Sequence, residues 1–156
     1  MKPIVCLLLL LTGCAPASHT STAASQDRAE VNAEAQLIEL ADSVFSAARA
    51  RDAERFASYF LDRPGFAYLI NKRRLSSVAE VRDTFRSMLA RQRSFEPRWG
   101  SRRVQVIQPT AGIVTGDFAT RAERSDGGAW EASGVVTFVA VREAAGWRVV
   151  SWHTTE

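Results

Sequence analysis

The chain has 156 residues and a formal net charge of +3, from 20 Lys and Arg residues against 17 Asp and Glu residues. This length predicts one domain, with or without a tail. With 46% apolar and 24% charged residues, the composition is typical of a soluble globular protein. It excludes collagen-like, coiled-coil, multi-span membrane and wholly disordered chains. Two cysteines and two histidines leave few groups for metal or thiol chemistry.

The first residues have the pattern of an export signal. A short positive stretch is followed by an apolar run from Ile4 to Leu11, which is much shorter than the roughly 20 residues that span a bilayer. The run ends in Leu11-Thr12-Gly13-Cys14. This box resembles the cleavage site of bacterial lipoproteins. The resemblance implies a signal peptide over residues 1–13 and lipid attached to Cys14; the alternative is an ordinary cleaved signal with chance cysteines.

The residue after the cysteine bears on the location of the protein. Ala15, rather than Asp, stands there. By the sorting rules of bacterial lipoproteins, this implies a lipid-anchored protein of the cell envelope, on the periplasmic face of the outer rather than the inner membrane. Residues 14–31 are rich in Ala, Ser and Thr and have no large apolar side chain before Val31. They predict a flexible tether, because they cannot recover the entropy lost on ordering.

The folded domain is expected over residues 32–156, and it opens with helical periodicity. Leu37, Leu40, Val44 and Phe45 lie on one stripe, which predicts an amphipathic helix from Asn32 to about Arg51. A short second helix is expected after it, with Asp52 as its N-cap and an apolar face formed by Phe56, Tyr59 and Phe60.

A strand and a third helix follow. The apolar run Phe66–Ile70 predicts a strand that ends in a charged turn at residues 71–74. Ser77-Val78-Ala79-Glu80 is a capping box, in which the hydroxyl and the carboxylate satisfy free amides at a helix start. We expect this helix to end near Ser94, with Phe85 on its buried stripe.

After this helix, the spacing of the apolar residues changes from three or four residues, which is typical of helices, to two, which is typical of strands. Alternating segments predict strands at residues 103–108, 113–124, 130–142 and 146–154, joined by hairpin-length turns. Helices followed by an antiparallel meander predict an α+β domain, with three N-terminal helices packed on a curved antiparallel sheet.

Two segments resemble a known superfamily. One is the helical run from Ala50 to Phe60, and the other is the closing strand Gly146-Trp147-Arg148-Val149-Val150-Ser151-Trp152-His153. Together they are similar to the nuclear transport factor 2-like superfamily, in its SnoaL-like and calcium/calmodulin-dependent kinase II association-domain-like branches. The resemblance implies a cone-shaped sheet with an apolar pocket at its open end. It also implies a homodimer formed through the outer face of the sheet.

Candidate chemistry is limited to acid–base groups. His153 shares a face with Trp147 and Val149 on a regular last strand, so it is expected to face the pocket. Tyr59 and Tyr68 would donate hydrogen bonds to a ligand oxygen. The alternative for all three candidates is a structural role. A regular strand also places Trp152 on the opposite, outer face.

Three large side chains, Trp147, Trp130 and Phe85, are expected to line the pocket. No metal, cofactor or nucleic acid is expected. The leading hypothesis is a membrane-anchored module that binds a small hydrophobic ligand or dimerises. A metal-free isomerase- or cyclase-like enzyme acting on a small hydrophobic carbonyl compound stays open as an alternative. So does a structural envelope protein that contacts lipid phosphates through the arginines between Lys72 and Arg103.

Overall fold

The computed structural model describes the backbone of residues 20–156 and the side chains of residues 27–156. The expected signal peptide over residues 1–13 and Cys14 lie outside the described residues. None of the helices in the described part of the chain is long and apolar enough to cross a membrane.

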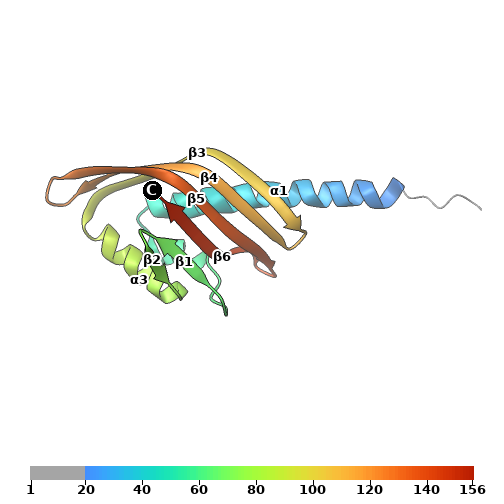
Figure 1. The fold of residues 1–156 in the computed structure, drawn as a ribbon, viewed down its shortest axis with the longest axis horizontal. Coiled ribbons are helices and arrows are strands. Elements are labelled where there is room, and N and C mark those ends of the chain that lie inside the picture. Colours follow the sequence, from blue (N-terminus) through green and yellow to red (C-terminus); the bar gives the residue numbers. More distant parts are fainter. Residues whose placement is uncertain (1–19) are drawn as a thin grey trace, which may run out of the picture.

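The first helix is longer than the sequence predicts. α1 runs over Thr20–Arg49, and its first part extends past the sheet (Figure 1). Leu37, Val44 and Phe45 are buried, as the apolar stripe predicts. Residues 27–31, where we expect tether, are helical and exposed. Alanine and long polar residues favour helix locally, and here they extend a helix that packing already holds in place.

The turn after α1 ties three elements together. Arg51 has a positive φ of 59°, and Asp52 caps α2 (Ala53–Ser58) by accepting the N–H of Arg55 at 2.9 Å. The guanidinium of Arg51 donates to the carbonyl oxygens of Leu89 at 2.8 Å and Arg93 at 3.1 Å. The end of α1 is thereby fastened to the segment that follows the third helix.

The capping box of the third helix is confirmed. α3 runs over Val78–Leu89, and the Ser77 hydroxyl accepts the N–H of Glu80 at 3.1 Å. The Glu80 carboxylate in turn accepts the N–H of Ser76 at 2.7 Å. The helix ends at Leu89 and not near Ser94, because the chain is already paired in the sheet from Gln92 onward.

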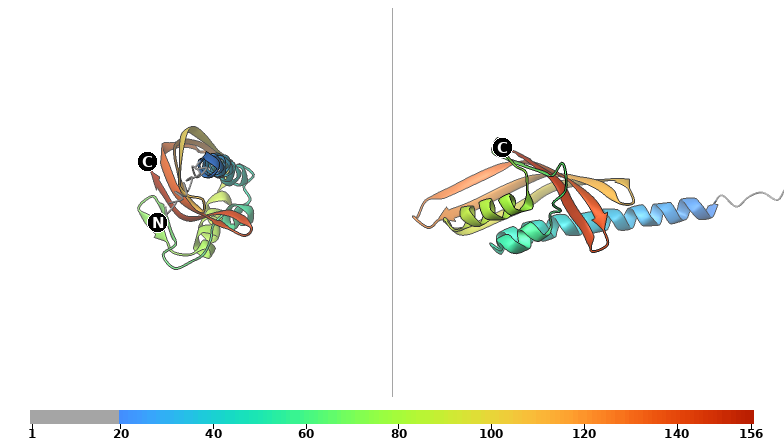
Figure 2. Two further views of the ribbon diagram at one scale, coloured as in Figure 1. Left: turned by 90° about the vertical axis from the view of Figure 1, so that its right-hand side faces the viewer. Right: turned by 90° about the horizontal axis from the view of Figure 1, so that it is seen from below.

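One six-stranded sheet forms the other layer, in the order β2-β1-β6-β5-β4-β3. Its strands are β1 (Ala67–Ile70), β2 (Arg73–Leu75), β3 (Gln92–Gln108), β4 (Ala111–Arg124), β5 (Ala129–Glu143) and β6 (Gly146–Thr155). β1 pairs parallel to β6, and all the other pairs are antiparallel. The sheet curves over α1 and α3 without closing, as the two turned views show (Figure 2). The predicted α+β architecture is therefore confirmed.

Two strands differ from the prediction. β2 occupies part of the expected charged turn, which is reduced to Asn71 and Lys72, both with positive φ. β3 begins at Gln92 instead of Arg103. The inward side chains of its first half are Phe95, Pro97 and Trp99, an alternation that is itself a strand pattern.

A β-bulge in β6 reverses the side-chain alternation near the end of the chain. Val149 pairs with Ala140, but the next pair is Ser151 with Val139, so Val150 is an extra residue on β6. Trp147 and Val149 face the core before the bulge, and Trp152 faces the core after it. The prediction that His153 continues the inward face is wrong, as is the outward placement of Trp152, because one inserted residue exchanges the two faces.

Candidate functional site

An apolar cavity of about 130 Å³ lies between the sheet and the helices. Its walls come from all three helices that pack under the sheet and from five strands; Phe45, Phe56, Phe85, Phe95, Trp130 and Trp152 are among them. The side chains from α1 and α3 are those of the predicted apolar stripes. The strand side chains alternate inward with period two. Aromatic rings from the helices and from the sheet therefore line the cavity from opposite sides.

Contacts between these rings hold the walls in position. Phe56 and Phe85 stack with centroids 4.1 Å apart, which joins α2 to α3. Phe95 contacts Trp130 at 6.2 Å, which joins β3 to β5. Such offset and tilted pairs are favoured by the quadrupoles of the rings beyond the area they bury. The cavity therefore has a defined, largely preformed shape.

Tyr68 places a phenol hydroxyl inside this mostly apolar wall. Its ring stacks on Trp152, with centroids 5.6 Å apart and planes 5° from parallel. Its side chain is buried, and burial raises the pKa of its hydroxyl, because the phenolate would lose hydration without gaining a partner. Within residues 27–156 no fully enclosed side-chain oxygen or nitrogen lacks a partner. No described side chain bonds the Tyr68 hydroxyl, so it opens on the cavity.

The lining has four other polar residues. Thr120 is buried in the wall, and Thr154 accepts the indole N–H of Trp152 at 2.8 Å. Asn71 and Glu156 are exposed at the rim. Among residues 27–156, no histidine or aspartate lines the cavity. The arrangement suits a neutral ligand body with one hydrogen-bond acceptor near Tyr68.

A wider space, which we call the vestibule, borders the cavity. It has a volume of about 840 Å³ and shares Asn71, Met88, Trp130, Ala132 and Glu156 with the cavity lining. It adds the end of α3 and the hairpin between β4 and β5, including Arg91 and Arg124. The β4–β5 hairpin, which lines the vestibule, lies at the end of the domain opposite the first turns of α1 (Figure 1).

The predicted catalytic residues do not meet in the cavity. Tyr68 lines it, but Tyr59 lies in a separate surface groove, where its hydroxyl accepts a hydrogen bond from Arg55 Nε at 3.2 Å. His153 is exposed on the other face of β6, because of the bulge at Val150.

Of the predicted pocket residues, Phe85 and Trp130 line the cavity. Trp147 does not, although it is buried. Its indole N–H donates to Gln36 Oε1 at 2.9 Å on the side of α1 that faces the groove with Tyr59. Sequence reasoning missed Trp152 as a cavity residue, since no local signal marks the bulge. It also missed Phe95, which the alternation Phe95-Pro97-Trp99 could have revealed.

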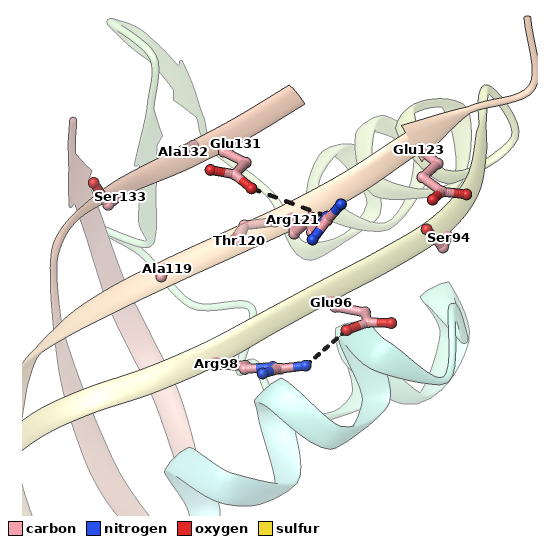
Figure 3. Close-up of a pocket in the computed structure, with 10 residues that line it drawn as sticks. All are labelled: Ser94, Glu96, Arg98, Ala119, Thr120, Arg121, Glu123, Glu131, Ala132 and Ser133. Atoms are coloured by element: carbon pink, nitrogen blue, oxygen red, sulfur yellow. Dashed lines mark hydrogen bonds and ion pairs between the residues drawn. The ribbon is translucent and has the colours of Figure 1, made fainter. Parts of the chain in front are cut away.

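The outer face of the sheet carries a second, larger concavity of about 530 Å³ (Figure 3). Its charged groups neutralise one another: Arg98 donates to Glu96 at 2.9 Å, and Arg121 lies 3.9 Å from Glu131. Glu123 is bound by Arg93, and the pKa of the Glu123 carboxyl is lowered by that hydrogen bond. This surface is open and internally paired, so it is a weaker candidate for binding a small molecule. Among the residues described, no three His, Cys, Asp or Glu side chains converge to hold a metal ion.

Several arginines between Lys72 and Arg103, the segment that could contact lipid phosphates, are paired. On α3, Arg86 forms ion pairs with Glu54 and Asp83, and Arg82 with Asp83. On β3, Arg93 pairs with Glu123. The positive charge of this segment is therefore partly compensated by neighbouring carboxylates.

The raised pKa of Tyr68 predicts how its titration and its contribution to stability depend on pH. Because burial raises the folded pKa, Tyr68 contributes stability that is intact below about pH 10, the ordinary pKa of tyrosine, and is lost as pH rises toward the folded pKa. The difference between the absorbance titrations of the wild type and Tyr68→Phe reports the tyrosinate of Tyr68. We expect that difference to appear only well above pH of about 10 or on unfolding; a difference that is complete near pH of about 10 in the folded protein would contradict the buried, neutral phenol.

Comparison with known proteins agrees with this fold. Residues 37–154 match the model of the SnoaL-like domain. A nuclear transport factor 2-like protein from Salmonella enterica serovar Typhimurium LT2 has a TM-score of 0.74 at 14% identity, over 80% of this chain and 91% of that chain. The hexachlorocyclohexane dehydrochlorinase LinA-type3 from Novosphingobium barchaimii LL02 has a TM-score of 0.71 at 14% identity, over 83% of this chain and 89% of that chain.

A third similar structure is that of a candidate calcium/calmodulin-dependent protein kinase II association domain from Xanthomonas campestris. It has a TM-score of 0.66 at 15% identity, over 76% of this chain and 83% of that chain. A search among curated proteins finds no match. Likeness at these identities shows the fold and not the activity. The family model, by contrast, covers most of the folded part of the chain. The chain therefore belongs to the SnoaL-like domain family and has the fold of the nuclear transport factor 2-like superfamily.

Proposed function

We propose that this domain is a non-catalytic binding module for a small apolar molecule with one hydrogen-bond acceptor. The observation that carries the proposal is the aromatic cavity on which the buried hydroxyl of Tyr68 opens without a side-chain partner among the described residues. An apolar ligand would gain burial against the rings, and its acceptor would satisfy the phenol. A ligand without an acceptor would leave that hydroxyl unpaired, which costs free energy.

The size of the cavity suits a single ring. At about 130 Å³ it is close to the engineered apolar cavity of about 150 Å³ that binds benzene in another protein. A larger ligand would extend into the vestibule past Met88 and Trp130.

The enzyme alternative has less support. General acid–base catalysis needs a base within hydrogen-bond reach of the substrate. His153 lies on the opposite face of β6, and Tyr68 is a buried neutral phenol whose raised pKa makes it a poor base. Glu156, at the rim, is the carboxylate that lines the cavity, and it is exposed. Dehydrochlorinases share the fold, but the fold hosts many functions.

Ligand binding should be measurable through Trp130 and Trp152, which line the cavity. We expect cyclohexanone to change the tryptophan fluorescence of the wild type saturably. Tyr68→Phe should weaken binding by about five- to tenfold, because it removes one hydrogen bond and keeps the ring. Cyclohexane, which lacks an acceptor, should not lose affinity in Tyr68→Phe.

Filling the cavity provides the matched control for that titration. Ala132→Leu adds volume inside the lining, and it should abolish binding of both compounds. Ala129→Leu places the same side chain on an exposed position of the same strand and should have no effect. Binding that is unchanged in Ala132→Leu would exclude the cavity as the site.

The same proposal includes a lipid anchor at Cys14 and an envelope location, supported by Leu11-Thr12-Gly13-Cys14 after the apolar run. Several acyl chains together give stable membrane attachment. Expressed in a bacterial host, Cys14→Ser should release the protein from the membrane fraction on cell fractionation. Cys6→Ser, inside the apolar run, should leave it anchored. Retention of Cys14→Ser in the membrane fraction would rule out this anchor.

Homodimerisation through the outer face of the sheet is the last part of the proposal. Ile113, Val135 and Val139 present apolar surface there, and Val135 is 40% exposed. Light scattering after size exclusion should give the dimer mass for the soluble domain. Val135→Arg should shift it to the monomer, because it places a charge in the apolar surface that a second copy would cover. The exposed Ile107→Arg should not; a monomeric wild type would refute the dimer.

A further inference from the structure

We propose that the ligand of this cavity is an amphipathic anion, a ring carried in the cavity with a carboxylate that binds Arg91 and Arg124 in the vestibule. This inference rests on the proposed function and narrows its ligand class. It starts from the side chains that the vestibule adds to the apolar lining.

The backbone holds the two arginines together. Arg91 follows α3, and Arg124 is the last residue of β4. The N–H of Ser125 donates to the carbonyl oxygen of Arg91 at 3.1 Å, and Arg124 is the register partner of Gln92. Residues far apart in the sequence are therefore fixed side by side at one edge of the vestibule.

Neither guanidinium is neutralised in the described part of the chain. Arg93 and Arg121, close by on the outer face, form ion pairs with Glu123 and Glu131. For Arg91 and Arg124 no ion pair or side-chain hydrogen bond is found among residues 27–156. Both side chains line the vestibule, and a carboxylate that contacts them would gain charge-assisted hydrogen bonds.

The vestibule also carries three carboxylates, those of Asp126, Glu131 and Glu156, against its two arginines. Asp126 Oδ1 accepts the N–H of Gly128 at 3.0 Å, which holds it in the hairpin turn, and Glu131 lies 3.9 Å from Arg121 on the outer face. All three charges oppose an anion, and Glu156 does so at the rim of the cavity itself. A bound carboxylate is therefore favoured only where it contacts Arg91 and Arg124 directly.

The cavity and the vestibule share five lining residues and so lie side by side, which is the arrangement that one ligand occupying both would need. Met88 and Trp130 line both spaces, so a ring held in the cavity can extend a short chain past them. A ring joined to a carboxylate by two or three methylene groups has the required shape.

The test compares 3-(4-oxocyclohexyl)propionate with 3-(4-oxocyclohexyl)propan-1-ol, which has the same ring, chain and ketone acceptor for Tyr68 but no charge. Tryptophan fluorescence titrations at low salt should show the acid binding about three- to tenfold more tightly. This preference should disappear in the Arg91→Gln/Arg124→Gln double variant, and it should weaken in salt of about 0.5 M. Glu156→Gln should increase it.

The control is Arg63→Gln/Arg103→Gln, which removes the same charge from exposed positions outside the vestibule. It should keep the preference for the acid. Equal affinity for acid and alcohol in the wild type, or a preference that survives loss of both vestibule arginines, overturns the anion inference while leaving the cavity as a binding site. If neither compound binds, the proposed function itself fails, and this inference fails with it.

Discussion

The extra residue Val150 in β6 decides what the cavity is made of. Without it, strict alternation would turn Ser151 and His153 inward and leave Trp152 in solvent. With it, the Trp152 indole stacks on Tyr68 at 5.6 Å and on Phe138 at 5.4 Å. It thereby links β1, β6 and β5 in one layer of rings. The wall, and the position of the Tyr68 hydroxyl in that wall, both depend on this bulge.

The bulge also determines the chemistry that is within reach. It removes the imidazole from the interior and leaves a phenol whose pKa is raised by burial. A neutral phenol among aromatic rings is a hydrogen-bond donor and orients a ligand, but it does not abstract protons at neutral pH. The same fold carries dehydrochlorinases such as LinA-type3, so the difference between binding and catalysis in this architecture comes from a few side chains and not from the layers.

Much of the fold could be predicted because its signals are local. The apolar stripe of α1, the Asp52 cap, the Ser77–Glu80 box and the period-two strands depend on neighbours in the sequence. The features that were missed depend on distant partners. Three such features are the parallel pairing of β1 with β6, the start of β3 at Gln92 and the bulge at Val150. They form when the sheet packs over the helices. The residue types in β6 do not indicate its bulge.

The same distinction holds for the candidate site: residues placed by local periodicity could be predicted, and residues placed by distant pairing could not. Phe85 and Trp130 follow from helix and strand periodicity, and both line the cavity. His153 and Trp152 exchanged faces because one register shift acts on every residue beyond it. The juxtaposition of Arg91 and Arg124 required the hairpin to return to the end of α3, which periodicity does not encode.

The most direct test of this account is a nuclear magnetic resonance titration of the soluble domain with cyclohexanone. The indole signals of Trp130 and Trp152 should shift with ligand concentration, while the imidazole signals of His153 and the indole signal of Trp147 stay unchanged. A ligand-dependent shift at His153 with none at Trp152 would contradict the account, because it would place the imidazole, and not the Tyr68–Trp152 wall, at the binding site.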